Sequence, residues 1–118
     1  MKKLLQTKNL SKTYVQTQGF FSRVRTNIHA LDNVSFSINQ GTTMAVVGES
    51  GSGKSTLAKS LVRLVNLDKG SVSFNGIDLL NLEGEKLKSV RKDIQMIFQD
   101  PYASLNPRLS ILQIMEEP

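Results

Sequence analysis

Nine consecutive residues, GESGSGKST at positions 48–56, have the types and spacing that bind a polyphosphate. They fit the pattern G-x-x-x-x-G-K-[ST], with Gly48, Gly53, Lys54 and Ser55 in the defined places. Glycines allow backbone N–H groups to converge on an anion, and Lys54 adds a full positive charge for the β- and γ-phosphates. The Ser55 hydroxyl suits Mg²⁺, which keeps most of its waters and takes few protein ligands.

The intervening positions complete a loop that is small and open. Ser50 and Ser52 keep the space between the glycines clear, and a helix that begins near Lys54 points unpaired N–H groups at the phosphates. The pattern therefore predicts a nucleotide-binding set made of Gly48, Glu49, Ser50, Gly51, Ser52, Gly53, Lys54, Ser55 and Thr56.

Two elements must position this loop. The apolar run at residues 44–47 predicts a buried strand that leads into it, and residues 54–65 predict the helix that leads out. Leu57, Leu61 and Leu64 recur at i, i+4 and i+7, which predicts one apolar stripe against a sheet.

The rest of the chain predicts a mixed topology in which an antiparallel β region precedes the β-loop-α unit. Asn75-Gly76 is a strong hairpin signal, and Ser110 with Gln113 forms a capping box. The expected elements are strands at 4–10, 30–38, 71–74, 77–79 and 94–98, a loop or extended hairpin at 11–28, a turn at 39–41, and helices at 82–90 and from 110 onward.

Composition limits the function classes. The chain has 118 residues, a formal net charge of +5 and no cysteine, so it carries no disulfide framework or cysteine metal site. Its Lys and Arg residues are scattered, which favours a solvated surface over a nucleic-acid interface. No apolar run approaches the ~20 residues that span a bilayer. These signals predict a protein that is neither secreted nor integral to a membrane.

A second candidate anchor lies at the end of the apolar run 94–98. In one interpretation Gln99 reaches the nucleotide site; in the other Asp100 is the acidic residue on the Mg²⁺ side, as in compact kinases and GTPases. An acid of that kind follows its strand directly, whereas Gln99 intervenes here and Pro101 follows. No D-x-x-G or N-K-x-D pattern is present, so Gln99 is favoured.

Four segments together resemble the ATP-binding subunits of ABC transporters: LSKTY at 10–14, ALDNVSF at 30–36, the loop at 48–56, and QMIFQDPYASLNPR at 95–108. The FQDPYASLNPR stretch and the FFSR insertion at 20–23 resemble the dipeptide/oligopeptide (and nickel) importer branch in particular. The resemblance covers essentially the whole chain. It implies an α/β fold of the P-loop NTPase type, with an N-terminal antiparallel β region and a β-P-loop-α unit.

For the site, the resemblance implies that residues 48–55 bind the phosphates of ATP, with Mg²⁺ on Ser55. Gln99 would be the glutamine that touches Mg²⁺ or the attacking water, so that Lys54 and Gln99 form the catalytic pair. Tyr14 is the best match to an aromatic residue that stacks on adenine; Phe20 and Phe21 are alternatives, and Tyr14 could instead simply pack on the sheet.

Some family motifs do not occur in these 118 residues: the L-S-G-G-Q signature, the Walker-B acid with its catalytic glutamate, and the switch histidine. His29 lies too early to be the switch residue, and Glu116 and Glu117 follow no apolar strand. Residues 1–118 are therefore expected to be the N-terminal part of one ATP-binding domain, with an incomplete core sheet. The expected consequences are an apolar edge at 44–47, marginal stability with no cooperative, concentration-independent melt above about 45 °C, and negligible ATPase activity.

Three functional hypotheses remain. The first is an importer subunit at the inner face of the cell membrane that energises uptake of peptides, or of nickel, together with transmembrane permease subunits and a second ATP-binding subunit. Residues 99–108 would be its docking surface for the permease. The second is an inactive nucleotide-binding remnant. The third is a compact P-loop kinase or GTPase that uses Asp100.

Overall fold

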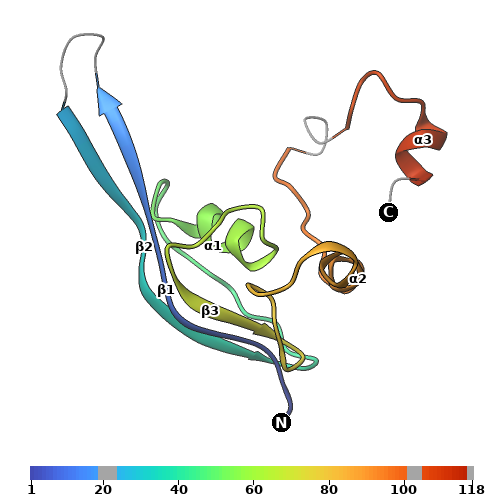
Figure 1. Ribbon diagram of the computed structural model, residues 1–118, viewed down its shortest axis with the longest axis horizontal. Helices are drawn as coiled ribbons and strands as arrows, with labels where there is room; N and C mark the ends of the chain where they lie inside the picture. Colours follow the sequence, from blue (N-terminus) through green and yellow to red (C-terminus); the bar gives the residue numbers. More distant parts are fainter. Residues whose placement is uncertain (19–23, 101–104, 117–118) are drawn as a thin grey trace.

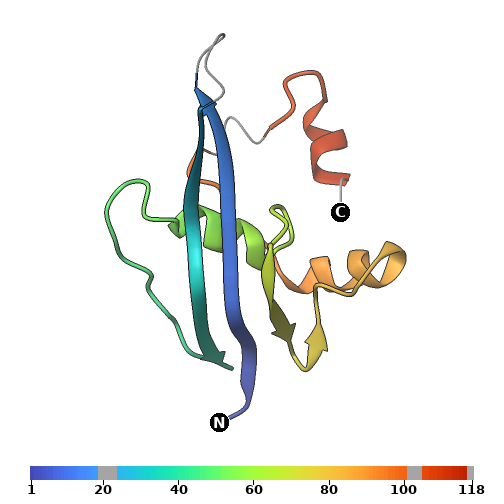
Figure 2. The same ribbon diagram turned by 60° about the vertical axis from the view of Figure 1, so that its left-hand side comes forward.

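The computed structural model describes residues 1–18, 24–100 and 105–116. Four strands form one antiparallel sheet in the order β2-β1-β3-β4. The strands are β1 (Lys3–Gln18), β2 (Val24–Asn39), β3 (Lys69–Phe74) and β4 (Ile77–Asp78), and the helices are α1 (Lys54–Leu61), α2 (Gly84–Asp93) and α3 (Ile111–Glu116). Helix α1 lies on one face of this sheet, whereas α3 lies away from it (Figures 1 and 2). None of the helices in these ranges has both the length and the apolar character needed to cross a bilayer.

The long pair of strands β1 and β2 dominates the sheet. Within the range 11–28, residues 11–18 and 24–28 are paired strands, which favours the hairpin expectation over the loop. The two strands pair from Lys3 with Asn39 to Gln18 with Val24, with several shifts of register. Asn9 and Asn33 adopt positive φ angles of 51° and 53° close to such shifts. Bulges of this kind bend a strand and increase its twist, and the sheet curves accordingly around α1 (Figure 1).

The Asn75-Gly76 prediction is confirmed. These two residues join β3 to β4 with φ angles of 48° and 84°, as the mirror-image turn of a tight hairpin requires. Strand β3 then pairs antiparallel with β1, for example Val72 with Thr7. The short β3–β4 hairpin therefore extends the sheet on the side of β1 opposite to β2.

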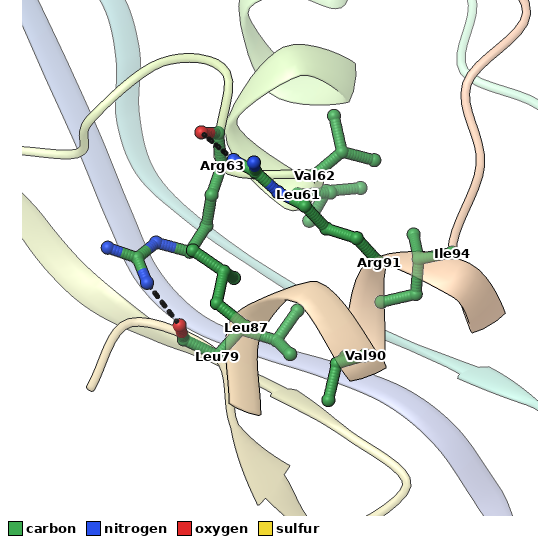
Figure 3. Close-up of a pocket in the computed structure, with 8 residues that line it drawn as sticks. All are labelled: Leu61, Val62, Arg63, Leu79, Leu87, Val90, Arg91 and Ile94. Carbon is green, nitrogen blue, oxygen red and sulfur yellow. Dashed lines mark hydrogen bonds between the residues drawn. The ribbon is translucent and has the colours of Figure 1, made fainter. Parts of the chain in front are cut away.

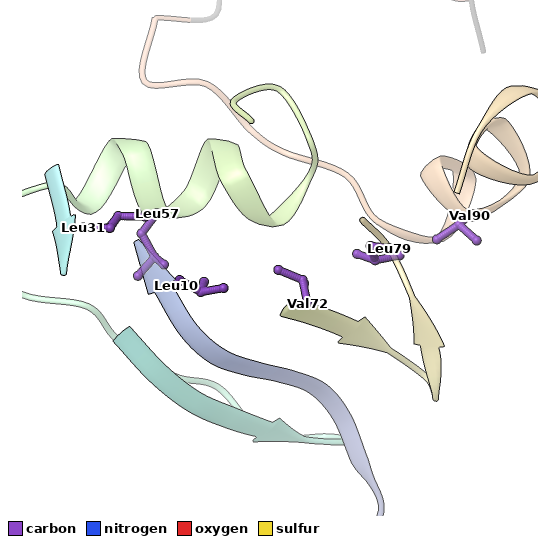
Figure 4. Close-up of a cluster of buried hydrophobic side chains, with 6 residues drawn as sticks. All are labelled: Leu10, Leu31, Leu57, Val72, Leu79 and Val90. Atoms are coloured by element: carbon purple, nitrogen blue, oxygen red, sulfur yellow. The ribbon is translucent and has the colours of Figure 1, made fainter. Parts of the chain in front are cut away.

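A small core holds these elements together. It contains six buried side chains from the sheet, from the residue that follows β4, from α1 and from α2, shown in Figure 4: Leu10, Leu31, Leu57, Val72, Leu79 and Val90. Leu10 and Val72 are fully inaccessible to solvent. The core thus lies between the sheet and α1 and continues past the end of β4 to Val90 of α2.

Helix α1 is shorter than the sequence pattern predicts, because it ends at Leu61 rather than at residue 65. Arg63 takes a positive φ of 55°, and its guanidinium donates a hydrogen bond to the Leu79 carbonyl at 3.1 Å (Figure 3). The same guanidinium also donates to the Leu82 carbonyl. The chain therefore leaves the helix to reach these acceptors, and Leu64 is 53% exposed instead of continuing the apolar stripe.

Two predicted strands do not form. Residues 44–47 and 94–98 have no sheet partner in the described part of the chain. Val47 is 89% exposed, so the expectation of a buried strand at 44–47 is also wrong, and Ile97 in the second segment is 95% exposed. The physical reason is that an apolar run becomes a strand only when another strand satisfies its backbone groups. Residues 44–47 are apolar and exposed, but they lie outside the sheet and do not form the edge strand that was expected.

The capping box at the start of α3 is confirmed. The Ser110 N–H donates to Gln113 Oε1 at 2.9 Å, and the Gln113 N–H donates to Ser110 Oγ at 3.3 Å. Yet Ile111, Leu112 and Met115 are 78%, 67% and 79% exposed, so this helix is capped but packs little of its apolar surface.

Candidate nucleotide-binding site

Lys54 is the centre of the loop at residues 48–56. Its ammonium donates to the carbonyls of Gly48 and Glu49 at 2.7 and 2.6 Å, and to Ser52 Oγ at 3.3 Å. The loop therefore surrounds the Lys54 ammonium, which is held in place by these hydrogen bonds to loop oxygens. A positive charge in that place can attract the anionic groups of a polyphosphate.

Gly53 joins the loop to α1 and meets two steric demands. It is the N-cap residue with φ 94°, and a Cβ atom built on it would lie 2.1 Å from the Ala30 carbonyl oxygen of β2. Only glycine fits without a shift of the backbone. The sheet and the loop thus touch at this point, which fixes the position of the helix start.

The N-terminus of α1 has the character of an anion site. Gly53 provides no side-chain cap, and the first turn contains no acidic residue. The first N–H groups of a helix have no partner within the helix, and they carry the positive end of its dipole. Together with the ammonium of Lys54, they fit the phosphate groups of a nucleotide.

A pocket of about 230 Å³ connects this loop with the hairpin. Gly51, Gly53, Lys54, Ser55 and Thr56 line one part of it, and Tyr14, Ile28 and Ala30 line the rest. The structure therefore brings the predicted aromatic residue Tyr14 next to the predicted phosphate loop. An aromatic and apolar wall beside a cationic loop suits a ligand with a planar base at one end and phosphates at the other.

Other predicted site residues lie outside this pocket. Glu49, Ser50 and Gln99 are exposed, and Gln99 is not among the residues that line it. Because the segment before Gln99 is not held in a sheet, nothing in the described ranges directs its amide toward the loop. Asp100 is exposed as well. Phe20, Phe21, Glu117 and residues 101–104 of the predicted docking surface lie outside the described residues.

His29 is exposed, and its Nδ1 lies 3.1 Å from Thr13 Oγ1. No group of three or more His, Cys, Asp or Glu side chains that could hold a metal ion occurs within the described ranges. Mg²⁺ commonly keeps several waters and binds through few protein ligands together with substrate phosphates.

The sequence patterns missed Ile28 and Ala30 as pocket residues. Both lie on β2, where Ile28 is the strand partner of Tyr14. A strand pattern alone does not reveal that this part of the hairpin faces a loop about twenty residues further along the chain. They also missed Lys12, whose Nζ lies over the Tyr14 ring at 5.4 Å from its centroid. Lys12 and Tyr14 are two residues apart in the sequence, and this spacing was the available signal for their contact.

Comparison with known proteins gives consistent relatives. The oligopeptide transport ATP-binding protein AppF of Bacillus subtilis is 47% identical over 98% of this chain. The glutathione import ATP-binding protein GsiA of Escherichia coli is 45% identical over 98% of it. The chain spans only 35% of AppF and 18% of GsiA.

Solved structures agree with this. A dimeric bacterial ABC transporter cassette, MJ0796, is 33% identical and superposes with a TM-score of 0.72 over 90% of this chain and 42% of its own. A post-hydrolysis state of the same cassette, bound to ADP and Pi, gives 0.61 at 32% identity over 75% of this chain and 35% of its own. The ABC transporter family model matches residues 31–116. With its phosphate-binding loop and antiparallel sheet in place, this chain belongs to the ABC transporter family.

Proposed function

We propose that this chain binds ATP with Mg²⁺ as part of the ATP-binding subunit of an ABC importer. The observation that carries the proposal is the shared pocket of Tyr14 and the Lys54 loop. Residues 48–56 would hold the phosphates, Ser55 would ligate Mg²⁺, and Tyr14 would stack on adenine. Bound Mg²⁺ would offset negative charge on the phosphates. The ATP-hydrolysing family and the ADP-bound cassette support the choice of nucleotide.

Lys54→Met tests nucleotide binding directly. We expect it to lower the affinity for ATP at least about tenfold, because it removes the cation at the centre of the loop. Lys59→Met removes the same charge from an exposed position in α1 and should leave the affinity unchanged. Isothermal titration with ATP, with and without Mg²⁺, measures both. Equal affinities for wild type and Lys54→Met would contradict the proposed site.

Hydrolysis by these 118 residues alone is a separate matter. We propose that Gln99 acts in catalysis only when its segment is held against the pocket, since it does not line that pocket here. The isolated chain should accordingly release negligible phosphate from ATP. Measurable turnover that disappears in Lys54→Ala would show that the residues present already suffice.

For the whole subunit, we propose uptake of peptides driven by ATP. The names of AppF and GsiA, which refer to oligopeptides and glutathione, favour peptides over nickel. The subunit would act at the inner face of the cell membrane with transmembrane permease subunits and a second ATP-binding subunit. The dimeric MJ0796 cassette supports the pairing of two such subunits. Residues 1–118 would form the N-terminal part of its ATP-binding domain, with residues 99–108 facing the permease.

A further inference from the structure

Lys12 and Tyr14 form a contact that the proposed nucleotide site does not require. Both lie on β1 two residues apart, on either side of a shift in the register of β1 with β2 between Lys12 and Thr13. The Lys12 ammonium lies over the Tyr14 ring, 5.4 Å from its centroid. A cation over an aromatic face is attracted by the ring and occupies the space in which a planar ligand could stack. One face of Tyr14 is therefore covered by protein.

Asp68 fixes the position of that ammonium. Its Oδ1 lies 3.1 Å from Lys12 Nζ, and its Oδ2 accepts a hydrogen bond from the Thr13 N–H at 2.7 Å. Its own N–H donates to the Ser11 carbonyl at 2.9 Å. Asp68 thus contacts three consecutive residues of β1. The hydrogen bond from Thr13 and the ion pair with Lys12 both lower the pKa of Asp68, so its carboxyl group is ionised at neutral pH.

The pair is less exposed than an ordinary surface salt bridge, since the Lys12 side chain is only 17% accessible and that of Asp68 44%. Exposed ion pairs contribute little to stability. If the Lys12–Asp68 ion pair served only the stability of the fold, the contact between Lys12 and the Tyr14 ring would not be required. Asp68 also lies in the connection between α1 and β3. One helix therefore begins at the phosphate loop and leads, through its following connection, to the residue that holds Lys12 on Tyr14.

We propose that Lys12, anchored by Asp68, is a positioning residue for Tyr14 in recognition of the nucleobase. By covering one face of the ring, it restricts the tyrosine to one orientation and leaves only the opposite face for the base. This inference rests on the proposed binding of ATP in the same pocket. It assigns to Lys12 and Asp68 an effect on the base end of the ligand and none on the phosphate end.

The test compares Mg²⁺–ATP with inorganic triphosphate, which lacks a base, by isothermal titration on the full chain. Lys12→Met keeps an aliphatic stem but removes the ammonium, and Asp68→Asn removes the charge that anchors it. We expect each to weaken ATP binding about two- to fivefold, the range of an exposed cation–π contact. Triphosphate binding should stay constant. Lys12→Arg, which retains the cation, should restore ATP binding, and Lys8→Met serves as the charge-matched control on β1.

A measurement without ligand supports the same conclusion independently. Proton NMR should find the Lys12 ε-methylene signal shifted upfield by the Tyr14 ring, and this shift should disappear in Tyr14→Leu and shrink in Asp68→Asn. An unshifted signal in the wild type would overturn the inference even if Lys12→Met fails to fold.

The titrations separate the two proposals. If the wild type binds neither ATP nor triphosphate, the proposed function fails and the inference fails with it. If the wild type binds ATP and all the variants match it, only the inference is overturned. Parallel loss of ATP and triphosphate in Lys12→Met would also overturn it, because Lys12 would then act as a charge for the phosphates.

Discussion

The antiparallel sheet and the segments at residues 44–47 and 94–98 contain similar apolar residues, but these residues differ in how far they are buried. Leu10 and Val72 in the sheet are fully buried, whereas Val47 and Ile97 are 89% and 95% exposed. Strands β1 and β2 follow one another in the sequence and pair antiparallel, so each has a partner close to it along the chain. The two unpaired segments have no such neighbour among the described residues. Apolar character therefore selects a strand only where a partner is available.

Truncation of a core side chain should have the largest effect on stability. Leu10→Ala removes a fully buried side chain from the sheet and should lower the free energy of unfolding by about 2–5 kcal/mol. Val47→Ala changes an exposed position in the unpaired segment and should stay within about 0.5 kcal/mol. Urea unfolding followed by circular dichroism measures both. Equal losses would show that residues 44–47 are packed in solution.

A smaller effect is expected where the sheet touches the phosphate loop. Gly53→Ala introduces left-handed strain of about 1–2 kcal/mol and also places a Cβ atom against the Ala30 carbonyl, so ATP binding should be lost as well. Gly41→Ala is the matched control, because its φ is also positive, at 75°, but no atom lies within 4 Å of the new Cβ and Gly41 does not line the pocket. Thermal unfolding and ATP titration of both variants test this. Identical behaviour would mean that β2 does not contact the loop.

The smallest effect on stability, but a clear one on association, is expected for the unpaired segment itself. Val47→Lys should leave unfolding almost unchanged and reduce self-association, because exposed unpaired apolar backbone promotes pairing between molecules. Val15→Lys makes the same change at a position that is 61% exposed but lies in the paired hairpin, and it should not alter association. Sedimentation velocity at several concentrations distinguishes them. A wild-type chain that stays monomeric at all concentrations would contradict the expectation.

Local signals in the sequence predicted much of the structure. The Asn75-Gly76 turn, the Ser110 capping box and the start of α1 at Lys54 all depend on residues within a few positions of each other. Short-range geometry of this kind is encoded by backbone freedom and by side chains that can reach nearby N–H groups. The end of α1 was misjudged because Arg63 leaves the helix for carbonyls that lie 16 and 19 residues further along.

The sequence by itself determined the chemistry at the phosphate loop: where the cation lies, where glycine is required, and which family the chain resembles. Only the tertiary structure decided which residues share the pocket. It placed Tyr14 and Ala30 beside the loop, set the Lys12–Asp68 pair against the Tyr14 ring, and left Gln99 outside the pocket. The physical reason is that the chemistry of the phosphate loop depends on consecutive residues. The contacts in the pocket instead join segments that become neighbours only when strands pair and helices pack.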